Sequence, residues 1–279
     1  MTHTRARWWQ HPAGVVGVGL LCTYVALAVL GPWLAPASPT ALNLGRALAP
    51  PGGAALLGTD ENGIDLLSML LHGMRLSLWI ATCTTIISVL VGATLGAWVG
   101  LRGGWLDEGA MRVVDVLLAF PGIILNLALV ALMARPGVPH LIFALSLTGW
   151  VSYARVARGE ALALRQKEFV LASRLAGAGE AWLLGRHILP NLMSTLVVQA
   201  TYGFASVMLA EASLSFLGLG PQLPYTLGAL LAQGTTYLWS SSHISVAPGL
   251  TLGVIVLACN LTGDVLRDHW QPRRPSRLA

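Results

Sequence analysis

Six long apolar runs, separated by polar or mixed stretches, dominate the pattern of hydrophobic and polar positions along the chain. Each run approaches the roughly twenty residues that a helix needs to cross the hydrocarbon of a bilayer. The pattern therefore predicts an all-α fold, a polytopic membrane protein with six transmembrane helices. The expected spans are approximately residues 13–34, 76–101, 113–133, 140–157, 191–214 and 247–266.

The first run could instead be the core of a signal peptide. Arg5 and Arg7 precede it, and the stretch LAPAS that follows it could be a cleavage site. The run is longer than a typical signal core, and more spans follow it. We therefore expect a retained first helix after a short N-terminal segment, residues 1–12.

Composition supports the membrane class and narrows the function. Hydrophobic residues make up 55% of the chain and charged residues 10%, whereas soluble domains carry about a quarter charged residues. The formal net charge is +5, but the arginines lie beside apolar runs and form no basic tract, so we expect no nucleic-acid partner. Cys22, Cys83 and Cys259 fall inside apolar runs without paired spacing, which predicts small buried side chains rather than disulfides or a metal site.

The distribution of basic residues orients the predicted bundle. They gather in the N-terminal segment, at residues 102–112, between residues 155 and 186, and in the tail. Because positive residues accumulate on the cytoplasmic side, six spans place both termini in the cytoplasm. Residues 158–190 then form a cytoplasmic loop, and residues 35–75 and 215–246 form periplasmic loops.

Glu168 to Asn191 is a polar, basic segment between two apolar runs. Apolar residues at helical spacing predict a short helix over 168–176, and a second helical pattern runs from Glu180 to just before Pro190. Gly177 and Gly179 break the two patterns, because glycine is costly in a helix and favourable in a turn. The segment is predicted to be a helix–turn–helix outside the membrane, which could be either an ordinary solvated loop or a docking element.

The same segment resembles the hallmark loop of the inner-membrane permeases of ABC importers, which reads E-A-A, three residues, Gly, nine residues, I-x-L-P. Leu171, Ala172 and Ser173 stand at the E-A-A positions, Gly177 follows at the family interval, and His187 occupies the isoleucine position. Leu171 and Ser173 replace the glutamate and the second alanine. The resemblance implies an ATPase-coupling loop whose site residues are Glu168, Leu171, Ala172, Ser173, Gly177, Ala178, Glu180, Arg186, His187, Leu189 and Pro190.

Further motifs resemble the dipeptide, oligopeptide and nickel branch of that family. The stretch GTDENGIDLLS followed by GMRLSL is similar to the branch signature G-T-D-x-x-G-R-D-x-x-S-R and G-x-R-x-S-L, with Ile64 and Met69 in place of two arginines. MRVVDVLLAFP, ASLSFLGLG and NLTGDVLRDHWQP also match. The nickel permeases look slightly closer than the peptide permeases, so the expected solute is nickel, as a chelate, or a di- or oligopeptide.

The chain has no phosphate-binding loop of the form G-x-x-x-x-G-K-[ST], no H-E-x-x-H and no C-x-x-C. We therefore expect no catalytic residue and no bound cofactor, with ATP and Mg used by partner subunits. No metal site is assigned, although His140 and His243 would be worth testing if nickel is carried. Polar residues within the spans are candidates for a substrate path: Asn126, Gln199, Tyr202, Glu211 and Asn260.

The resemblance also implies the assembly. A second related permease, two ATP-binding subunits and a periplasmic or lipoprotein solute-binding protein are expected beside this chain in the inner membrane. A stand-alone channel or an ion-coupled secondary transporter is the alternative, and it would predict inverted repeats and ionisable residues at mid-span. A membrane enzyme is disfavoured because no catalytic set clusters in the sequence.

Overall fold

The computed structural model describes residues 12–53, 55–133, 137–221 and 225–270, and its long regular elements are helices. The predicted segment 1–12 and the basic tail therefore lie almost wholly outside the described residues. The helices are α1 (Pro12–Leu34), α2 (Leu66–Arg102), α3 (Gly104–Ala119), α4 (Gly122–Ala131), α5 (Val138–Leu164), α6 (Glu168–Leu175), α7 (Glu180–Leu183), α8 (Leu189–Phe216), α9 (Leu227–Thr236) and α10 (His243–Trp270), with a 3-10 turn η2 (Leu44–Arg46) and a π-helical turn η3 (Leu184–Ile188).

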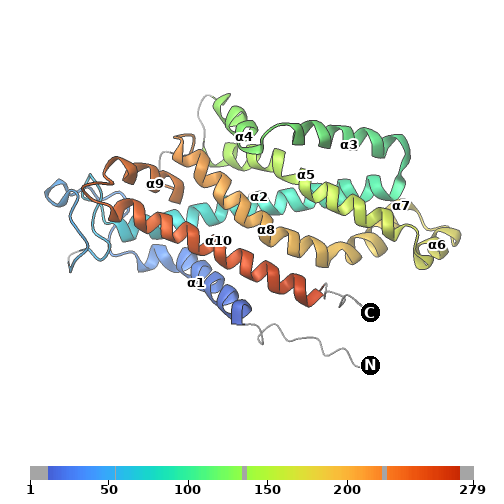
Figure 1. Cartoon of the computed structure of the whole chain (residues 1–279), viewed down its shortest axis with the longest axis horizontal. Helices are drawn as coiled ribbons and strands as arrows, with labels where there is room; N and C mark the ends of the chain where they lie inside the picture. Colours follow the sequence, from blue (N-terminus) through green and yellow to red (C-terminus); the bar gives the residue numbers. More distant parts are fainter. Residues whose placement is uncertain (1–11, 54, 134–136, 222–224, 271–279) are drawn as a thin grey trace, which may run out of the picture.

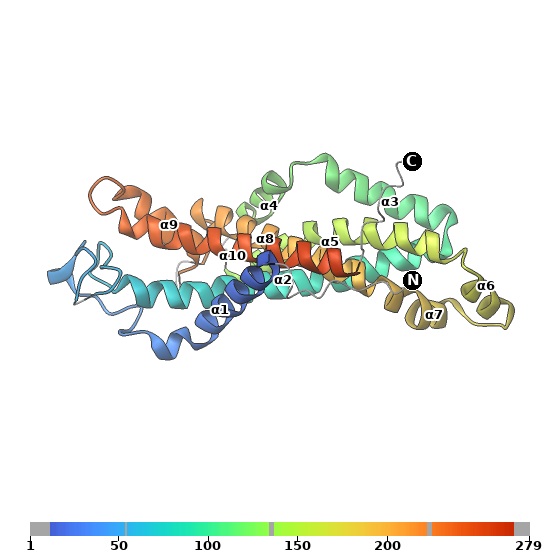
Figure 2. The same ribbon diagram turned by 60° about the horizontal axis from the view of Figure 1, so that its bottom comes forward.

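The long helices lie side by side in an elongated bundle (Figures 1 and 2). At one end, here called the α9 end, α9 meets the loop between α1 and α2. At the other end, the α6 end, α6 and α7 project beyond the long helices (Figure 1). Gly17 of α1 lies against Leu261 of α10, so the start of α1 and the end of α10 are neighbours, as an even number of spans requires.

The closest helix packing is between α2 and α5. Gly92, Gly96 and Gly100 line one face of α2 at four-residue spacing, and α5 fits against them with its backbone. A Cβ added at Gly96 would stand 2.1 Å from the carbonyl oxygen of Ala154. Small residues on such a face let two helix backbones approach closely. Close packing of this kind holds helices together in lipid, where the hydrophobic effect does not drive their association.

Four helices in the described part of the chain are long and apolar enough to cross a membrane: α1, α2, α10 and the continuous helix Glu180–Phe216. The bent pair α3–α4 makes a fifth if it counts as one span. Helix α5 lies parallel to α2, with Leu141 beside Ile80 at one end and Ala161 beside Gly100 at the other. The count of six spans stays a prediction. The packing of α5 along α2 favours it, because α5 would be the sixth span.

Helix α2 contains the second predicted span, 76–101, and extends beyond it. Helix α2 is 37 residues long and begins ten residues earlier, at Leu66. At about 1.5 Å per residue, Arg75 and Arg102 on α2 are about 40 Å apart, which is the thickness of a bilayer with its headgroups. Trp79 and Trp98 are about 29 Å apart on the same measure, matching the spacing of the two aromatic belts. The extra turns of α2 thus extend past the membrane at the α9 end.

The third predicted span, 113–133, is not one straight helix. The chain forms two helices there, α3 and α4, bent by 87°. Pro121 has no N–H to donate, and it restricts Phe120, which adopts an extended conformation with φ −90° and ψ 139°. Gly103 alone separates α2 from α3, so most of residues 102–112 are helical.

Two predicted loops contain ordered structure. In the first, Asp60 is fully buried, and its Oδ1 accepts hydrogen bonds from the backbone N–H of Asn62 and Ile64 at 2.9 and 2.7 Å. Asp65 caps α2 by accepting from the Ser68 N–H at 2.8 Å. Gly63 has φ +71°, and a Cβ there would collide with the backbone of Asn43. The motif Gly58-Thr59-Asp60 therefore forms part of a compact turn before α2.

The second loop, 215–246, contains α9, which anchors the first. Gln233 of α9 donates from Nε2 to Asp60 Oδ2 at 3.0 Å and to Glu61 Oε1 at 3.4 Å. A hydrogen bond to the Glu61 carboxylate raises the pKa of the Tyr237 phenol, which follows α9. The loop predicted at 215–246 thus contains a short helix that closes onto the loop before α2.

Candidate functional site

The segment Glu168–Asn191 forms the helix–turn–helix predicted for it, with one difference. Helix α6 ends at Leu175, Gly177 turns the chain with φ +88°, and α7 begins at Glu180. The second helix does not stop before Pro190, because the π-helical turn η3 joins α7 to α8 without a break. Pro190 lies directly after the π-helical turn, within this continuous helix, and has no N–H to donate to the preceding turn.

A buried cluster ties this segment to the membrane helices. Val170 of α6 and Leu183 of α7 are fully buried against Leu101 of α2 and Ala157 of α5. Beyond them the cluster continues along α8. The cluster therefore joins α6 and α7 to the ends of α2, α5 and α8 as one packed unit.

Polar contacts reinforce this connection at the end of α2. Arg165, which follows α5, donates from Nη1 to the carbonyl of Gly100 at 3.2 Å. Arg102 and Glu180 form an exposed ion pair at 3.9 Å, which contributes little stability by itself. The last turn of α2 thus contacts residues on both sides of α6.

His187 joins the two halves of the segment. Its Nε2 lies 3.0 Å from the Oγ of Ser173 on α6, and its ring makes edge contacts with Phe169 and Trp182 at centroid distances of 5.5 and 5.0 Å. The Ser173 hydroxyl already donates to the carbonyl of Phe169 at 2.8 Å. A hydroxyl has one proton, so the imidazole is the donor, and it donates from Nε2 to Ser173.

The outer face of α6 is apolar and solvent-exposed. Leu171 and Leu175 are four residues apart, hence on one face, and are 45% and 90% exposed. A separate groove of about 430 Å³ lies at the turn between α6 and α7, lined by Ser173, residues 176–179 and Trp182. The other predicted coupling residues are exposed or half-buried around this face: Glu168, Ala172, Gly177, Ala178, Glu180, Arg186, Leu189 and Pro190.

The predicted path residues are placed on several helices. Asn126 of α4 is buried and accepts a hydrogen bond from Thr148 of α5 at 2.8 Å. Tyr202 of α8 donates to Asp264 of α10 at 2.6 Å. Gln199 and Asn260 are half-buried on α8 and α10. The substrate path stays a prediction.

Glu211 is held in a polar node instead of lining open space. It is 0% exposed and accepts hydrogen bonds from Ser77 of α2 at 2.9 Å and from Ser215 at 2.7 Å. Thr226, which caps α9, also bonds its carboxylate. Ser77 in turn accepts from the N–H of Leu227. The node joins α2, α8 and α9, a connection that the polarity of one helix could not predict.

The two speculative metal ligands are not brought together as a metal group. His140 is exposed in the first turn of α5, whereas His243 Nε2 lies 3.4 Å from the carbonyl of Thr59 in the loop before α2. Within the described residues, no group of three or more His, Cys, Asp or Glu side chains could hold a metal ion. No resident metal is assigned.

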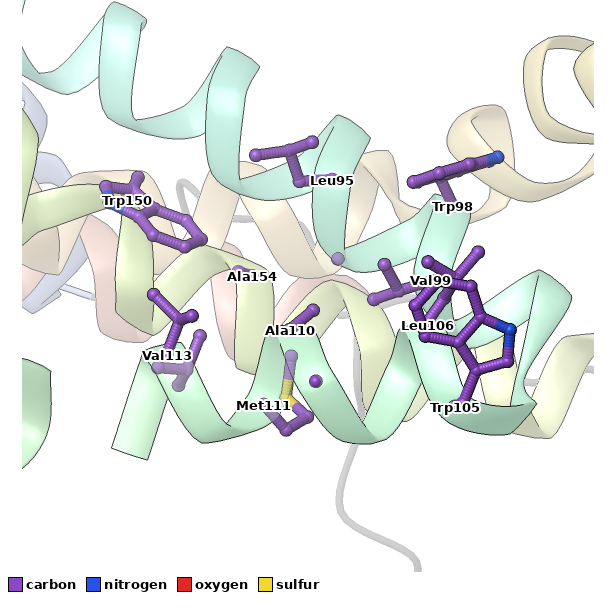
Figure 3. A pocket seen from close by; sticks show the side chains of 13 residues that line it. Leu95, Trp98, Val99, Trp105, Leu106, Ala110, Met111, Val113, Trp150 and Ala154 are labelled. Atoms are coloured by element: carbon purple, nitrogen blue, oxygen red, sulfur yellow. The ribbon is translucent and has the colours of Figure 1, made fainter. Parts of the chain in front are cut away.

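An apolar cavity of about 380 Å³ lies between α2, α3 and α5 (Figure 3). Trp98, Trp105 and Trp150 are among its lining side chains. Helix α3 is held to α5 by two ion pairs: Asp107 with Arg158 at 2.5 Å, with the aspartate buried, and Asp115 with Arg155 at 2.9 Å. Periodicity alone gave no sign of this cavity.

Two family profiles match parts of this chain. The profile of the family described as "Binding-protein-dependent transport system inner membrane component" matches residues 92–275, and that of the "N-terminal TM domain of oligopeptide transport permease C" matches residues 3–51. A putative peptide transport system permease protein of Brucella abortus is 39% identical over 97% of this chain and 91% of that protein.

Two further relatives span nearly the whole chain. A di/tripeptide transport system permease protein of Pseudomonas aeruginosa is 40% identical over 95% of this chain and 91% of its own length. A nickel transport system permease protein of Escherichia coli K12 is 36% identical over 95% of this chain and 94% of its own length.

Proposed function

The chain belongs to the family of binding-protein-dependent transport system inner membrane components, and from that premise we propose how its parts work. It is a multi-pass inner-membrane permease subunit of an ABC importer of the peptide and nickel branch. It is not itself the ATPase, and its family works with ATPase and binding-protein subunits.

We propose that α6 and α7 are the surface on which the ATPase docks. The observation that carries this proposal is the exposed leucine face of α6, held rigidly on the core that unites α2, α5 and α8. Leu171 stands where the family hallmark has a glutamate, so docking here depends on apolar burial at that position instead of an ion pair. An exposed apolar patch at the tip of a polar segment is typical of a protein contact.

The proposed movement follows from the continuity of the helices. When two ATPase subunits close on ATP and Mg, α6 and α7 move with them, and η3 carries the movement into α8. Helix α2 follows through Arg165 and the buried cluster. A solute path between this chain and a second permease then alternates between two openings, which requires a bistable element with different solute affinity in each state. A solute-binding protein delivers the solute at the α9 end.

For the solute we propose a di- or oligopeptide ahead of a nickel chelate. This reverses the slight preference from the motifs, because the peptide-system relatives are 39% and 40% identical and the nickel-system relative 36%. Uptake of labelled dipeptide and of ⁶³Ni into cells that lack the chain, with and without a plasmid copy, decides between them. Uptake of nickel without uptake of dipeptide would rank nickel ahead of peptides again.

Photo-crosslinking in the assembled importer tests the docking surface. A photoreactive residue at Leu175 should form an adduct with the ATPase subunit, whereas the same residue at Leu56, an exposed leucine before α2, should not. A Leu175 adduct with lipid, or none with the ATPase, would refute docking on α6. A channel or an ion-coupled transporter would purify without any ATPase.

A further inference from the structure

A second surface feature, independent of ATP coupling, lies on α1 and α2 toward the α9 end. A groove of about 580 Å³ runs along α2, with α1 contributing one wall. Val29 of α1, Leu76 and Trp79 provide apolar walls, and Thr82 lies further along α2. Arg75 also lines the groove.

Arg75 is unpaired among the residues that the structure describes. It is exposed and makes no ion pair or hydrogen bond with any residue that the structure describes. His72, one turn earlier on the same face, also lines the groove and donates from Nδ1 to the carbonyl of Ser68 at 2.8 Å, which leaves Nε2 unpaired. An unpaired guanidinium beside apolar walls suits an anion that carries a long apolar group.

The depth of the groove in the bilayer identifies the anion. Arg75 and Arg102 are about 40 Å apart along α2, the distance between the headgroup layers of a bilayer. Trp79 is 60% exposed and lies about 6 Å further in, at the level where interfacial tryptophans gather. Arg75 is therefore at the height of lipid phosphates, and the groove continues from it toward the hydrocarbon.

We propose that this groove holds a phospholipid of the leaflet at the α9 end. Its phosphate pairs with Arg75, and one acyl chain lies along Val29, Leu76 and Trp79 between α1 and α2. Guanidinium and phosphate form paired, charge-assisted hydrogen bonds that are strongest away from bulk water. The bound lipid fills the seam between α1 and the rest of the bundle. The protein therefore retains this lipid when bulk lipid is removed.

Native mass spectrometry of the importer in mild detergent tests this proposal. The wild type should retain one more phospholipid per copy of this chain than Arg75→Gln. Arg46→Gln is the matched control, because Arg46 is also exposed and free of ion pairs but lies outside the groove. Equal retention in wild type and Arg75→Gln would overturn the proposal.

A second experiment keeps Arg75 and so does not depend on a variant that could misfold. A photoreactive residue at Thr82, in the wall of the groove, should form an adduct with phospholipid. An adduct with another protein chain would show that a permease partner covers the groove, and would overturn the proposal.

Discussion

The imidazole of His187 lies 3.0 Å from the hydroxyl of Ser173, although fourteen residues separate them along the chain. Ser173 stands where the family hallmark has an alanine, and His187 where it has an isoleucine. The two polar residues therefore replace an apolar pair and satisfy each other. This contact joins α6 to the turn η3 and closes the coupling segment on itself.

Replacing the two residues singly and together tests whether they act as a unit. Ser173→Ala or His187→Ile alone should destabilise α6 by about 1 kcal/mol, because each removes one hydrogen bond and the first leaves the imidazole donor half-buried and unpaired. The double variant should recover most of this loss, since it restores the apolar pair. Hydrogen exchange of the α6 amides measures the effect, with about fivefold faster opening expected in each single variant. Additive losses in the double variant would show two independent residues.

The leucine face of α6 gives a second prediction. Leu171→Ser with Leu175→Ser should weaken ATPase binding at least tenfold, because burying each leucine is worth about 1.5–3 kcal/mol. Binding of purified ATPase to the solubilised permease measures this. Leu56→Ser removes an exposed leucine at the other end and should leave the affinity unchanged. Unchanged affinity in the double variant would place the docking surface elsewhere.

Gly177 is required by its backbone conformation and not by lack of room. Its φ is +88°, and no atom lies within 4 Å of an added Cβ. Gly177→Ala should therefore strain the turn by about 1–2 kcal/mol and lower the solute transported per ATP hydrolysed in proteoliposomes. Gly179 also has open space but has φ −72°, so Gly179→Ala should transport normally. Equal behaviour of the two variants would contradict this explanation.

The seam between α2 and α5 gives a prediction about stability. Gly96→Ala should destabilise the bundle by about 1–3 kcal/mol, because the new methyl group meets the backbone of Ala154. Gly253 of α10 has no atom within 4 Å of an added Cβ, so Gly253→Ala should be neutral or stabilising by up to about 1 kcal/mol. Thermal unfolding of the two variants in detergent compares them directly. A stable Gly96→Ala protein would mean that the seam is looser than described.

The sequence predicted the α-helical membrane class and the coupling segment, because both depend on local signals. An apolar run of membrane length predicts a helix independently of the residues that pack against it. Gly177 and Pro190 mark the turn and the start of α8 through their own backbone preferences. The Ser173–His187 contact could not be predicted, since it depends on how α6 folds back on η3.

Where the structure differs from the expected pattern, each difference has its own cause. Hydropathy marks where a helix enters lipid, and α2 continues beyond that point because protein at the α9 end covers its first turns. The bend between α3 and α4 follows from Pro121, because the residue before a proline, Phe120, is extended. The partners of Glu211, Ser77 and Thr226, could not be predicted because they are distant in sequence.

The sidedness of α6 tests the central claim most directly. In a chain whose Cys22, Cys83 and Cys259 are replaced by alanine, a single cysteine at Leu175 is labelled in intact cells with a membrane-impermeant maleimide. A single cysteine at Trp239, which is fully exposed at the α9 end, serves as the control. We expect the Trp239 position to react from outside, and the Leu175 position to react only after the membrane is opened. Labelling of Leu175 in intact cells would contradict docking of a cytoplasmic ATPase on this segment.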